Sequence, residues 1–466
     1  MINSSTEDQK QRRTKVAPVP LGWEKLKWYG PGLVWMVSSV GSGSILFTPR
    51  VGSRYGYDLL WAAMLVTFLT WVIIREIGRY TVVSGKTILD GYGGLKGPRG
   101  WAVWLIFLPG LVSGVVVVAG IAALIGSALV IVLPLDQSIS SVGIILISAL
   151  LVITGRYKKL ELVTSILAAV MIISIFLTAI AVFPGWSVYA AGMAPSLIPD
   201  FDPYFVLPWF GFLLAGAAGM MWFSYWVAAR GYGGEVLDDK KDGPDMHKKG
   251  TYLRGDPGER LRQWLVIMST TAAIGVIGAT LINFSFLTLG AELLRPLGVI
   301  PEGVRVAEDL ARLLGEVWGG PGRYLLVAGI FVALWGSILS NQDGWGRMYA
   351  DATLMLMPRG RERMKLGGSR PNLRRRYKNI YILVVLTVLP IIVFLLLRNP
   401  VDILSIAGII TAAHLPIVVT LTLYLNLRYL PRSLGPGTFF IISTVIAILF
   451  YGFFSIFFFY DLLTSG

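Results

Sequence analysis

Long runs of apolar residues, each long enough to cross a membrane as a helix, recur along almost the whole chain. A bilayer core of ~30 Å requires about 20 consecutive residues of α-helix. Gly, Pro and charged residues interrupt these runs, for example at Pro134, Pro184 and Pro400. The pattern predicts an all-α polytopic membrane protein. We expect eleven spans, at residues 28–54, 58–84, 101–133, 140–155, 159–184, 205–229, 263–290, 321–349, 379–398, 401–427 and 437–462.

The polar segments outside these runs are short. Residues 1–27 are polar and basic, and they lack the layout of a signal peptide, so we expect a flexible cytoplasmic tail. Residues 28–466 are expected to form a single transmembrane domain. Between two spans, residues 306–318 place apolar side chains at helical spacing, which predicts a short amphipathic helix on the outer surface.

Basic residues are distributed unevenly between alternate loops. With the N-terminus inside, 34 of the 41 Lys and Arg residues fall on the inner side. This asymmetry predicts a cytoplasmic N-terminus and an outer C-terminus, and we expect a location in the cell membrane or inner membrane. It also explains the net charge of +14 without a nucleic-acid partner. The densest basic run, at 359–378, is expected to be a solvated loop or a contact for anionic lipids.

Composition excludes several kinds of site. Only 15% of the residues are charged, against roughly 25% in soluble domains, and 55% are hydrophobic. The chain has no cysteine and two histidines, His247 and His414, so disulfides, thiolate sites and three-histidine metal sites are excluded. No paired carboxylates, phosphate-binding loop or nucleophile constellation occurs. We therefore expect no enzymatic activity and no cofactor, and the expected partners are the lipid bilayer and a small cargo.

Two spans contain clusters of small residues that favour a break in the helix. The first span carries four serines and two glycines at Ser38–Ser44, and the sixth carries Ala215–Met221. Broken helices free backbone groups that are tolerated only beside a cavity, so the two clusters predict a transport site. The alternative is a small-residue face that packs closely against a neighbouring helix. Breaks in the first and sixth spans are typical of a five-plus-five inverted repeat with an eleventh helix appended.

Four short motifs carry a family resemblance. They are Gly30-Pro31-Gly32, the segment 75–85 (REIGRYTVVSG), Gly126-Ser127-Ala128 and Leu415-Pro416-Ile417. In order and spacing, the chain resembles the Nramp (natural resistance-associated macrophage protein) family of divalent-metal transporters, from about residue 28 to 430. The resemblance implies the LeuT-like fold and transport by alternating access.

The residues at the family's metal site differ. In register with the family's Asp-Pro-Gly-Asn motif stands Gly41-Ser42-Gly43-Ser44, without a carboxylate. In the sixth span Ala217 and Met220 match the family motif, whereas Trp222 replaces a histidine. The third span lacks the acidic residues of the family's proton route, and His414 stands in place of a glutamine. The residues that the resemblance assigns to substrate binding are Gly41, Ser42, Gly43, Ser44, Ala217, Met220, Trp222 and Ser224.

Three further polar residues inside spans are candidates for coupling or gating. Asp343 and Asn341 lie in the eighth span, and His414 lies in the tenth. Asp343 and Arg347 are four residues apart, so they are expected to form an ion pair, with an ion or proton role as the alternative. His414 is either a satisfied core histidine or a pH-sensitive gate.

These observations leave three functional hypotheses. The first is an Nramp-related secondary transporter of a divalent cation, such as hydrated magnesium, through an altered site whose oxygen ligands come from serine hydroxyls, backbone carbonyls and Asp343. The second is a carrier of a small anionic or zwitterionic organic solute, such as an amino or carboxylic acid, held by helix N-termini at Gly41-Ser42-Gly43. The third is a non-transporting sensor on the same scaffold. We expect a monomer, although the sequence leaves the oligomeric state open.

Overall fold

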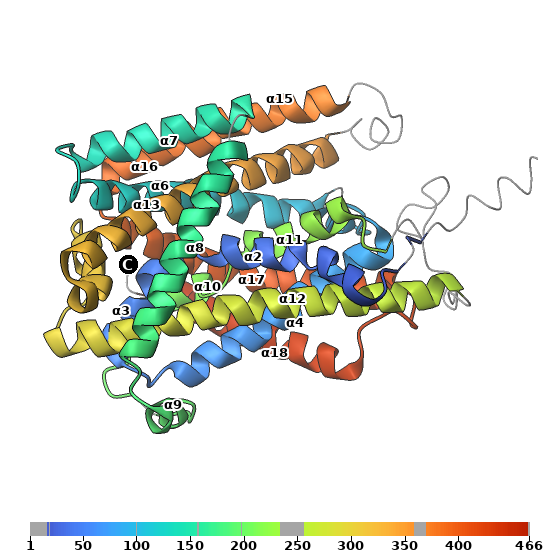
Figure 1. Cartoon of the computed structure of the whole chain (residues 1–466). Helices are drawn as coiled ribbons and strands as arrows, with labels where there is room; N and C mark the ends of the chain where they lie inside the picture. The colour runs from blue at the N-terminus through green and yellow to red at the C-terminus, as the bar shows by residue number, and fades with distance from the viewer. Residues whose placement is uncertain are drawn as a thin grey trace, which may run out of the picture.

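A computed structural model describes residues 16–17, 19–98, 100–155, 158–196, 198–233, 256–357 and 370–464. The described chain is helical and forms a bundle of long, roughly aligned helices, which α8 crosses obliquely (Figure 1). In chain order the elements are η1 (Gly22–Trp28), α2 (Gly30–Ser39), η2 (Gly43–Phe47), α3 (Thr48–Tyr55), α4 (Leu60–Ser84), α5 (Ile88–Gly93), α6 (Trp101–Leu129), α7 (Gln137–Thr154), α8 (Lys158–Ala181), α9 (Trp186–Gly192), α10 (Pro203–Phe212), α11 (Ala217–Arg230), α12 (Asp256–Leu289), η3 (Gly290–Leu294), η4 (Arg295–Leu297), α13 (Val306–Leu356), α15 (Arg370–Leu383), η5 (Val384–Val388), α16 (Leu389–Leu397), α17 (Pro400–Tyr429) and α18 (Thr438–Thr464).

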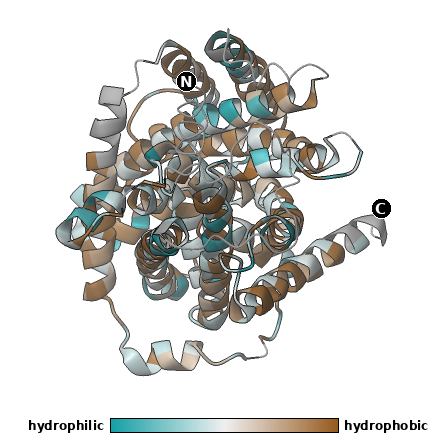
Figure 2. Cartoon of the chain, turned by 90° about the vertical axis from the view of Figure 1, so that its right-hand side faces the viewer, coloured by the Kyte–Doolittle hydropathy of each residue, from teal (hydrophilic) through white to brown (hydrophobic). Residues whose placement is uncertain are grey.

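The predicted number of spans agrees with the structure. Within the described residues, nine helices are long and apolar enough to cross a membrane, and the number rises to eleven when two bent helix pairs each count as one span. The pair Gly22–Ser39 and Gly43–Tyr55 bends by 51°, and the pair Ile166–Ala181 and Trp186–Gly192 bends by 104°. Viewed along the bundle, hydrophobic residues predominate on the outer helices (Figure 2). The predicted all-α membrane architecture is confirmed.

Part of the predicted tail, residues 1–27, lies among the described residues. Of the expected flexible segment 1–27, residues 1–15 lie outside the described residues. Val16 is buried, the Ala17 N–H donates to the Gly233 carbonyl at 2.8 Å, and the Trp264 indole donates to the Ala17 carbonyl at 3.0 Å. Residues Gly22–Trp28 form the 3-10 helix η1. The end of the tail is therefore packed against the bundle, because its apolar and backbone groups find partners there.

The helix predicted at 306–318 is present as the first part of α13. Its buried residues, Val306, Leu310, Leu313 and Leu314, recur at helical spacing and face the bundle. Gly319, at φ 65° and ψ −148°, then breaks the helix before the spanning part of α13. A positive φ of this kind is accessible mainly to glycine, so this residue permits the turn into the membrane.

Both predicted helix breaks exist, but the second lies earlier in the chain than expected. In the first span, α2 ends at Ser39, Val40 is non-helical at φ −78° and ψ 89°, and η2 starts at Gly43. In the sixth span, α10 ends at Phe212 and α11 begins at Ala217. The prediction that 215–221 is broken is therefore wrong from Ala217 onwards. Extended Gly216 caps a new helix, whose first bond runs from the Met220 N–H to the Gly216 carbonyl at 3.1 Å.

A buried ionic cluster joins α4 to α17. Glu76 is 1% exposed, and its carboxylate accepts hydrogen bonds from Arg75 at 2.6 Å, Arg79 at 2.9 Å and the Asn426 amide at 3.1 Å. Arg79 also donates to the carbonyls of Leu434 and Gly435, in the segment between α17 and α18. One carboxylate therefore satisfies donors from two helices and positions the segment that follows α17.

We predict that Glu76→Gln lowers the stability of the folded bundle strongly. The substitution leaves Arg75 and Arg79 buried without their counter-charge, which typically costs about 3–5 kcal/mol. Thermal unfolding of the purified protein, followed by tryptophan fluorescence, measures the change. Glu259→Gln is the matched control, because Glu259 and Arg262 form an exposed pair at 3.7 Å that is worth at most about 1 kcal/mol. Equal unfolding midpoints for the two variants would contradict the prediction.

Candidate transport site

The two helix breaks are in direct contact. A Cβ atom placed on Gly43 would lie 1.9 Å from the carbonyl oxygen of Phe212, the last residue of α10. Only glycine allows the start of η2 to approach the end of α10 this closely. The rings of Phe47 and Phe212 stack nearby, with centroids 6.2 Å apart. The breaks therefore bring two helix C-termini and two helix N-termini to one place in the middle of the bundle.

A cavity of about 90 Å³, called the central cavity below, lies where the breaks meet. Both breaks line it, together with residues of α6, α13 and α17. The polar groups of its lining residues are hydroxyl groups, one side-chain amide, two indoles and backbone groups, and none of the lining residues has an ionisable side chain. The residues that line the central cavity include Ser38, Gly41, Ser42, Gly43, Ser113, Gly216, Ala217, Trp222, Ser337, Asn341 and Thr411. The central cavity is thus polar but uncharged.

The predicted substrate-binding residues divide into two groups. Gly41, Ser42, Gly43, Ala217 and Trp222 line the central cavity, as does the gating candidate Asn341.

Ser44, Met220 and Ser224 do not line it. Ser44 and Met220 are buried in packed helix. The Ser224 hydroxyl donates to the Met221 carbonyl at 2.6 Å and accepts from the Ile88 N–H at 3.2 Å, so it joins α11 to the start of α5.

The sequence analysis missed three polar lining residues. Ser113 on α6 and Thr411 on α17 face each other with their hydroxyl oxygens 3.2 Å apart, and Ser337 lies on α13. Each is a small hydroxyl side chain in a largely apolar span, and the sequence offers no other signal for it. Such serines and threonines often bond back to their own helix, so their position beside the cavity could be seen only in three dimensions.

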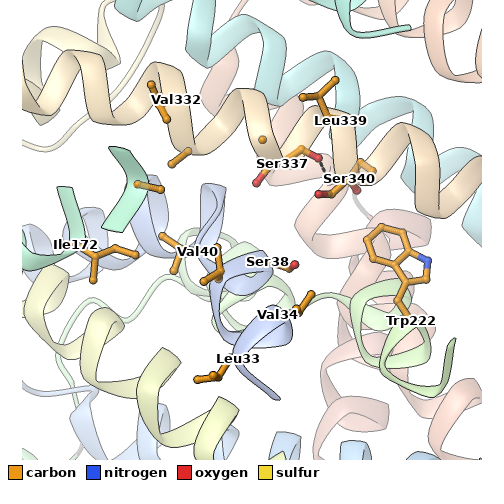
Figure 3. A pocket seen from close by; sticks show the side chains of 15 residues that line it. Leu33, Val34, Ser38, Val40, Ile172, Trp222, Val332, Ser337, Leu339 and Ser340 are labelled. Atoms are coloured by element: carbon orange, nitrogen blue, oxygen red, sulfur yellow. Dashed lines mark hydrogen bonds between the residues drawn. The ribbon is translucent and has the colours of Figure 1, made fainter. Parts of the chain in front are cut away.

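A second, larger cavity of about 300 Å³ adjoins the first and is called the side cavity. It lies between α2, α8 and α13, and Figure 3 shows Ser38 and Val40 on one wall opposite Ser337 and Ser340 on another. Ser38, Trp222, Ser337 and Asn341 line both cavities.

Trp222 stands between the two cavities. Its indole packs on Gly344, where an added Cβ would lie 2.8 Å from the ring. It also makes an edge-to-face contact with Trp345, whose ring centroid lies 5.8 Å away. The neighbouring helix thus limits the movement of this ring.

The opposite side of the breaks is closed by a dense polar network. The Thr48 hydroxyl bonds to the Asn283 side chain at 2.9 Å and accepts from the Trp209 indole at 3.0 Å. Further along α3, Arg50 donates to the Pro301 carbonyl at 3.2 Å and to Glu302 at 2.8 Å. The central cavity therefore adjoins the side cavity on the α2 side, whereas packed, hydrogen-bonded side chains close it on the α3 side.

The remaining coupling candidates lie outside both cavities. Asp343 forms the expected ion pair with Arg347, and it also contacts Lys378 of α15, a partner that sequence spacing could not indicate. His414 is 2% exposed, and its Nε2 has no hydrogen-bond partner within the described part of the chain. Neither side chain lines a cavity.

The described residues contain no group of three or more His, Cys, Asp or Glu side chains that could hold a metal ion. The oxygens at the central cavity are neutral, and such oxygens suit hard cations better than soft ones.

Comparison with known proteins gives a family. The family described as "Natural resistance-associated macrophage protein-like" matches residues 32–461. An uncharacterized protein, PM0681, of Pasteurella multocida is 27% identical over 146 residues, which cover 30% of this chain and 33% of that protein. A divalent metal cation transporter, MntH, of Acidiphilium cryptum is 25% identical over 182 residues, which cover 38% and 42%. The chain thus spans less than half the length of these curated relatives.

Solved structures confirm the predicted LeuT-like fold. A mutant of the Eremococcus coleocola manganese transporter superposes with a TM-score of 0.64 at 14% identity, covering 96% of this chain and 90% of that one. MhsT in complex with L-phenylalanine gives 0.54 at 16% identity, covering 91% and 98%.

We predict opposite outcomes for two glycines two residues apart. Gly43→Ala forces η2 away from the end of α10, so this variant loses thermal stability and monodispersity. Gly41→Ala keeps both, because the nearest atom to its new Cβ, the Ser337 Oγ, lies at 3.5 Å, an ordinary contact. Size-exclusion profiles and unfolding midpoints of the two variants test this. A Gly43→Ala protein as stable as Gly41→Ala would show that the breaks are not held by this contact.

Proposed function

Because the chain belongs to the natural resistance-associated macrophage protein-like family, we propose that it is a secondary transporter that moves a divalent metal cation across the membrane by alternating access. One observation carries this proposal: the two helix breaks meet at a polar cavity that is adjoined by open space on one side and sealed on the other. Alternating access requires a site of this kind, at the interface of two structural repeats.

The cargo site differs from a conventional divalent site because it lacks a carboxylate. Magnesium and calcium sites use carboxylate oxygens, and magnesium gives up its water ligands reluctantly. Hydroxyl groups such as those of Ser42, Ser113 and Thr411 can bind the water shell of an ion instead of replacing it. We therefore propose that the cation is carried at least in part hydrated, with magnesium as the best candidate and with weak affinity.

A second candidate cargo is a small zwitterionic or anionic organic solute. Gly216, Ala217 and Ala218 line the central cavity at the start of α11, where the first N–H groups of a helix have no acceptor within the helix. Such N–H groups and the positive end of the helix dipole suit a carboxylate. The same cavity also touches the C-terminal ends of α2 and α10, which suit an ammonium group.

Uptake into proteoliposomes decides between these cargoes. The purified protein is reconstituted and offered magnesium, manganese, amino acids and carboxylic acids in parallel, with empty liposomes as the control. Uptake of a divalent cation supports the proposal, whereas metal-independent uptake of an organic solute overturns it in favour of the second candidate. Absence of uptake of every solute would favour a sensor on the transporter scaffold.

We predict that Gly41→Asp raises the affinity for manganese by roughly tenfold or more. A carboxylate at this position supplies a charged oxygen ligand, and tenfold corresponds to about 1.4 kcal/mol. The Cβ of the new side chain makes only an ordinary contact, with the Ser337 Oγ at 3.5 Å, and residue 41 lines the central cavity. Manganese binding by calorimetry measures the effect, and Gly41→Asn is the uncharged control of similar size. An equal gain from Asn would show that charge is not what the site lacks.

We also propose that the N-terminus lies in the cytoplasm, that the C-terminus lies outside and that the protein is a monomer in the cell membrane. The absence of cysteine makes the topology easy to test, since a single introduced thiol is the only one present. Lys27→Cys on η1 and Glu316→Cys on the first part of α13 are both exposed positions. In intact cells, a membrane-impermeant maleimide should label Glu316→Cys and not Lys27→Cys. The reverse result would invert the topology.

A further inference from the structure

Three apolar side chains of the N-terminal segment face away from the protein. Trp23 is 86% exposed, Leu21 is 74% exposed and Leu26 is 56% exposed. They lie in or directly before the 3-10 helix η1, which precedes the spanning helix α2. Tryptophan is highly buried on average, and grouped exposed apolar side chains mark contacts with a membrane or another protein. The described residues leave these three side chains uncovered, so a partner is expected to cover them.

The exposed part of η1 has separate apolar and polar faces. A 3-10 helix has three residues per turn, so residues i and i+3 lie above one another. Trp23 and Leu26 share one such face, whereas Glu24 and Lys27 share the next, and all four side chains are exposed. The third face, with residues 25 and 28, is half-buried and turned to the bundle. Since protein covers the third face and the second suits water, the apolar face alone lacks a matching environment.

The packed face fixes the level of η1 along the bundle. The ring of Trp28 lies against Trp264 of α12, with centroids 4.5 Å apart, and the Trp264 indole also donates to the Ala17 carbonyl at 3.0 Å. Both ends of the segment are thus tied to one residue. Trp264 begins the apolar stretch of α12, directly after the charged positions Arg260 and Arg262. The segment is therefore held where α12 changes from charged to apolar, at the end of the bundle where α2 begins (Figure 1).

The side chains of η1 match the boundary between lipid headgroups and hydrocarbon. Tryptophan is enriched at this depth because its ring is apolar and its N–H is polar. Short helices that place Trp and Leu on one face and lysine on another lie at membrane surfaces, and basic residues attract anionic lipids to them. Between residues 10 and 28 the sequence has six basic residues and one acidic residue, Glu24. This charge is complementary to an anionic leaflet, and the bilayer already surrounds the adjoining spans.

We propose that η1 is an interfacial anchor, in which Trp23 and Leu26 insert into the leaflet on the side of the N-terminus and Lys27 contacts anionic phospholipid headgroups. In the topology proposed above this is the inner leaflet, but the anchor depends neither on that topology nor on transport. Arg230, at the end of α11, donates to the Lys27 carbonyl. The anchor therefore joins the start of α2 to the end of α11 at the membrane surface.

Nitroxide labels on single cysteines test the anchor, because the chain has no other thiol. Trp23→Cys and Leu26→Cys report on the apolar face, and Glu24→Cys and Lys27→Cys on the neighbouring polar face are the matched controls. The labelled full-length proteins are reconstituted into vesicles of phosphatidylethanolamine and phosphatidylglycerol. Power saturation then measures collisions with oxygen, which concentrates in hydrocarbon, and with a water-soluble nickel chelate. We expect a several-fold higher ratio of oxygen to nickel collisions at residues 23 and 26 than at 24 and 27.

Each label on the apolar face leaves the other apolar side chain in place, so one substitution does not remove the whole anchor. All four positions are exposed, and size-exclusion profiles should match that of the unlabelled protein. Equal ratios at the four positions would show that η1 lies in water and would overturn the proposal. Few collisions with either reagent at residues 23 and 26 would overturn it too, because another protein segment or a second copy would then cover this face.

The headgroup contact has its own test. Replacing phosphatidylglycerol by phosphatidylcholine should lower the oxygen-to-nickel ratio of the label at residue 23, because the attraction of an anionic surface for nearby basic residues is lost. In the Trp23→Cys/Lys27→Gln double variant, the difference between the two lipids should shrink. A ratio at residue 23 that is the same in both lipids would overturn the contact with anionic headgroups.

Discussion

The contact between Gly43 and the carbonyl of Phe212 is the constraint on which the candidate transport site depends. It sets two interrupted helices against each other, so that their freed backbone groups share one cavity. Similar close packing continues beside it, where a Cβ on Gly408 of α17 would lie 2.7 Å from Pro208 of α10. These contacts leave no room for side chains, and so the polar groups at the breaks are held in place by backbone packing. Small residues near the breaks therefore serve a packing role and a functional one together.

Three acidic residues of the helices form ion pairs with basic side chains and lie outside the two cavities. Glu76 is neutralised by two arginines, Asp343 by Arg347 and Lys378, and Asp351 by a two-pronged contact with Arg374 at 2.6 Å. Each of these clusters joins different segments of the bundle or ends of helices, and none of the three carboxylates lines either cavity. A charge inside the membrane is costly unless paired, which is why each acidic group has basic partners. These three carboxylates are paired with basic side chains outside the cavities, and the central cavity has no ionisable side chain in its lining.

Much of this architecture could be predicted from the sequence, because membrane helices must satisfy their own backbone and so leave a plain hydrophobic pattern. The break at Val40 followed from the run of serines and glycines in the first span. The second break was predicted too far along the chain, because the small residues of Ala217–Met221 are as compatible with a helix as with a break. The helix begins at Ala217 because Gly216 before it is extended. The Lys378 partner of Asp343 and the facing hydroxyls of Ser113 and Thr411 depend on contacts between distant segments, which no local pattern encodes.

A cavity without fixed charge has an electrical consequence. Where a binding site carries a carboxylate, part of the charge of the cargo is cancelled, and the empty carrier must bring the negative charge back. Here the empty site returns without net charge of its own, so a cation would cross together with its entire charge. Membrane voltage, which acts at about 2.3 kcal/mol per elementary charge per 100 mV, would then act on the loaded half of the cycle alone. In the transport cycle proposed above, a glycine at residue 41 would thus leave the membrane voltage to act on the bound cation and not on the empty site.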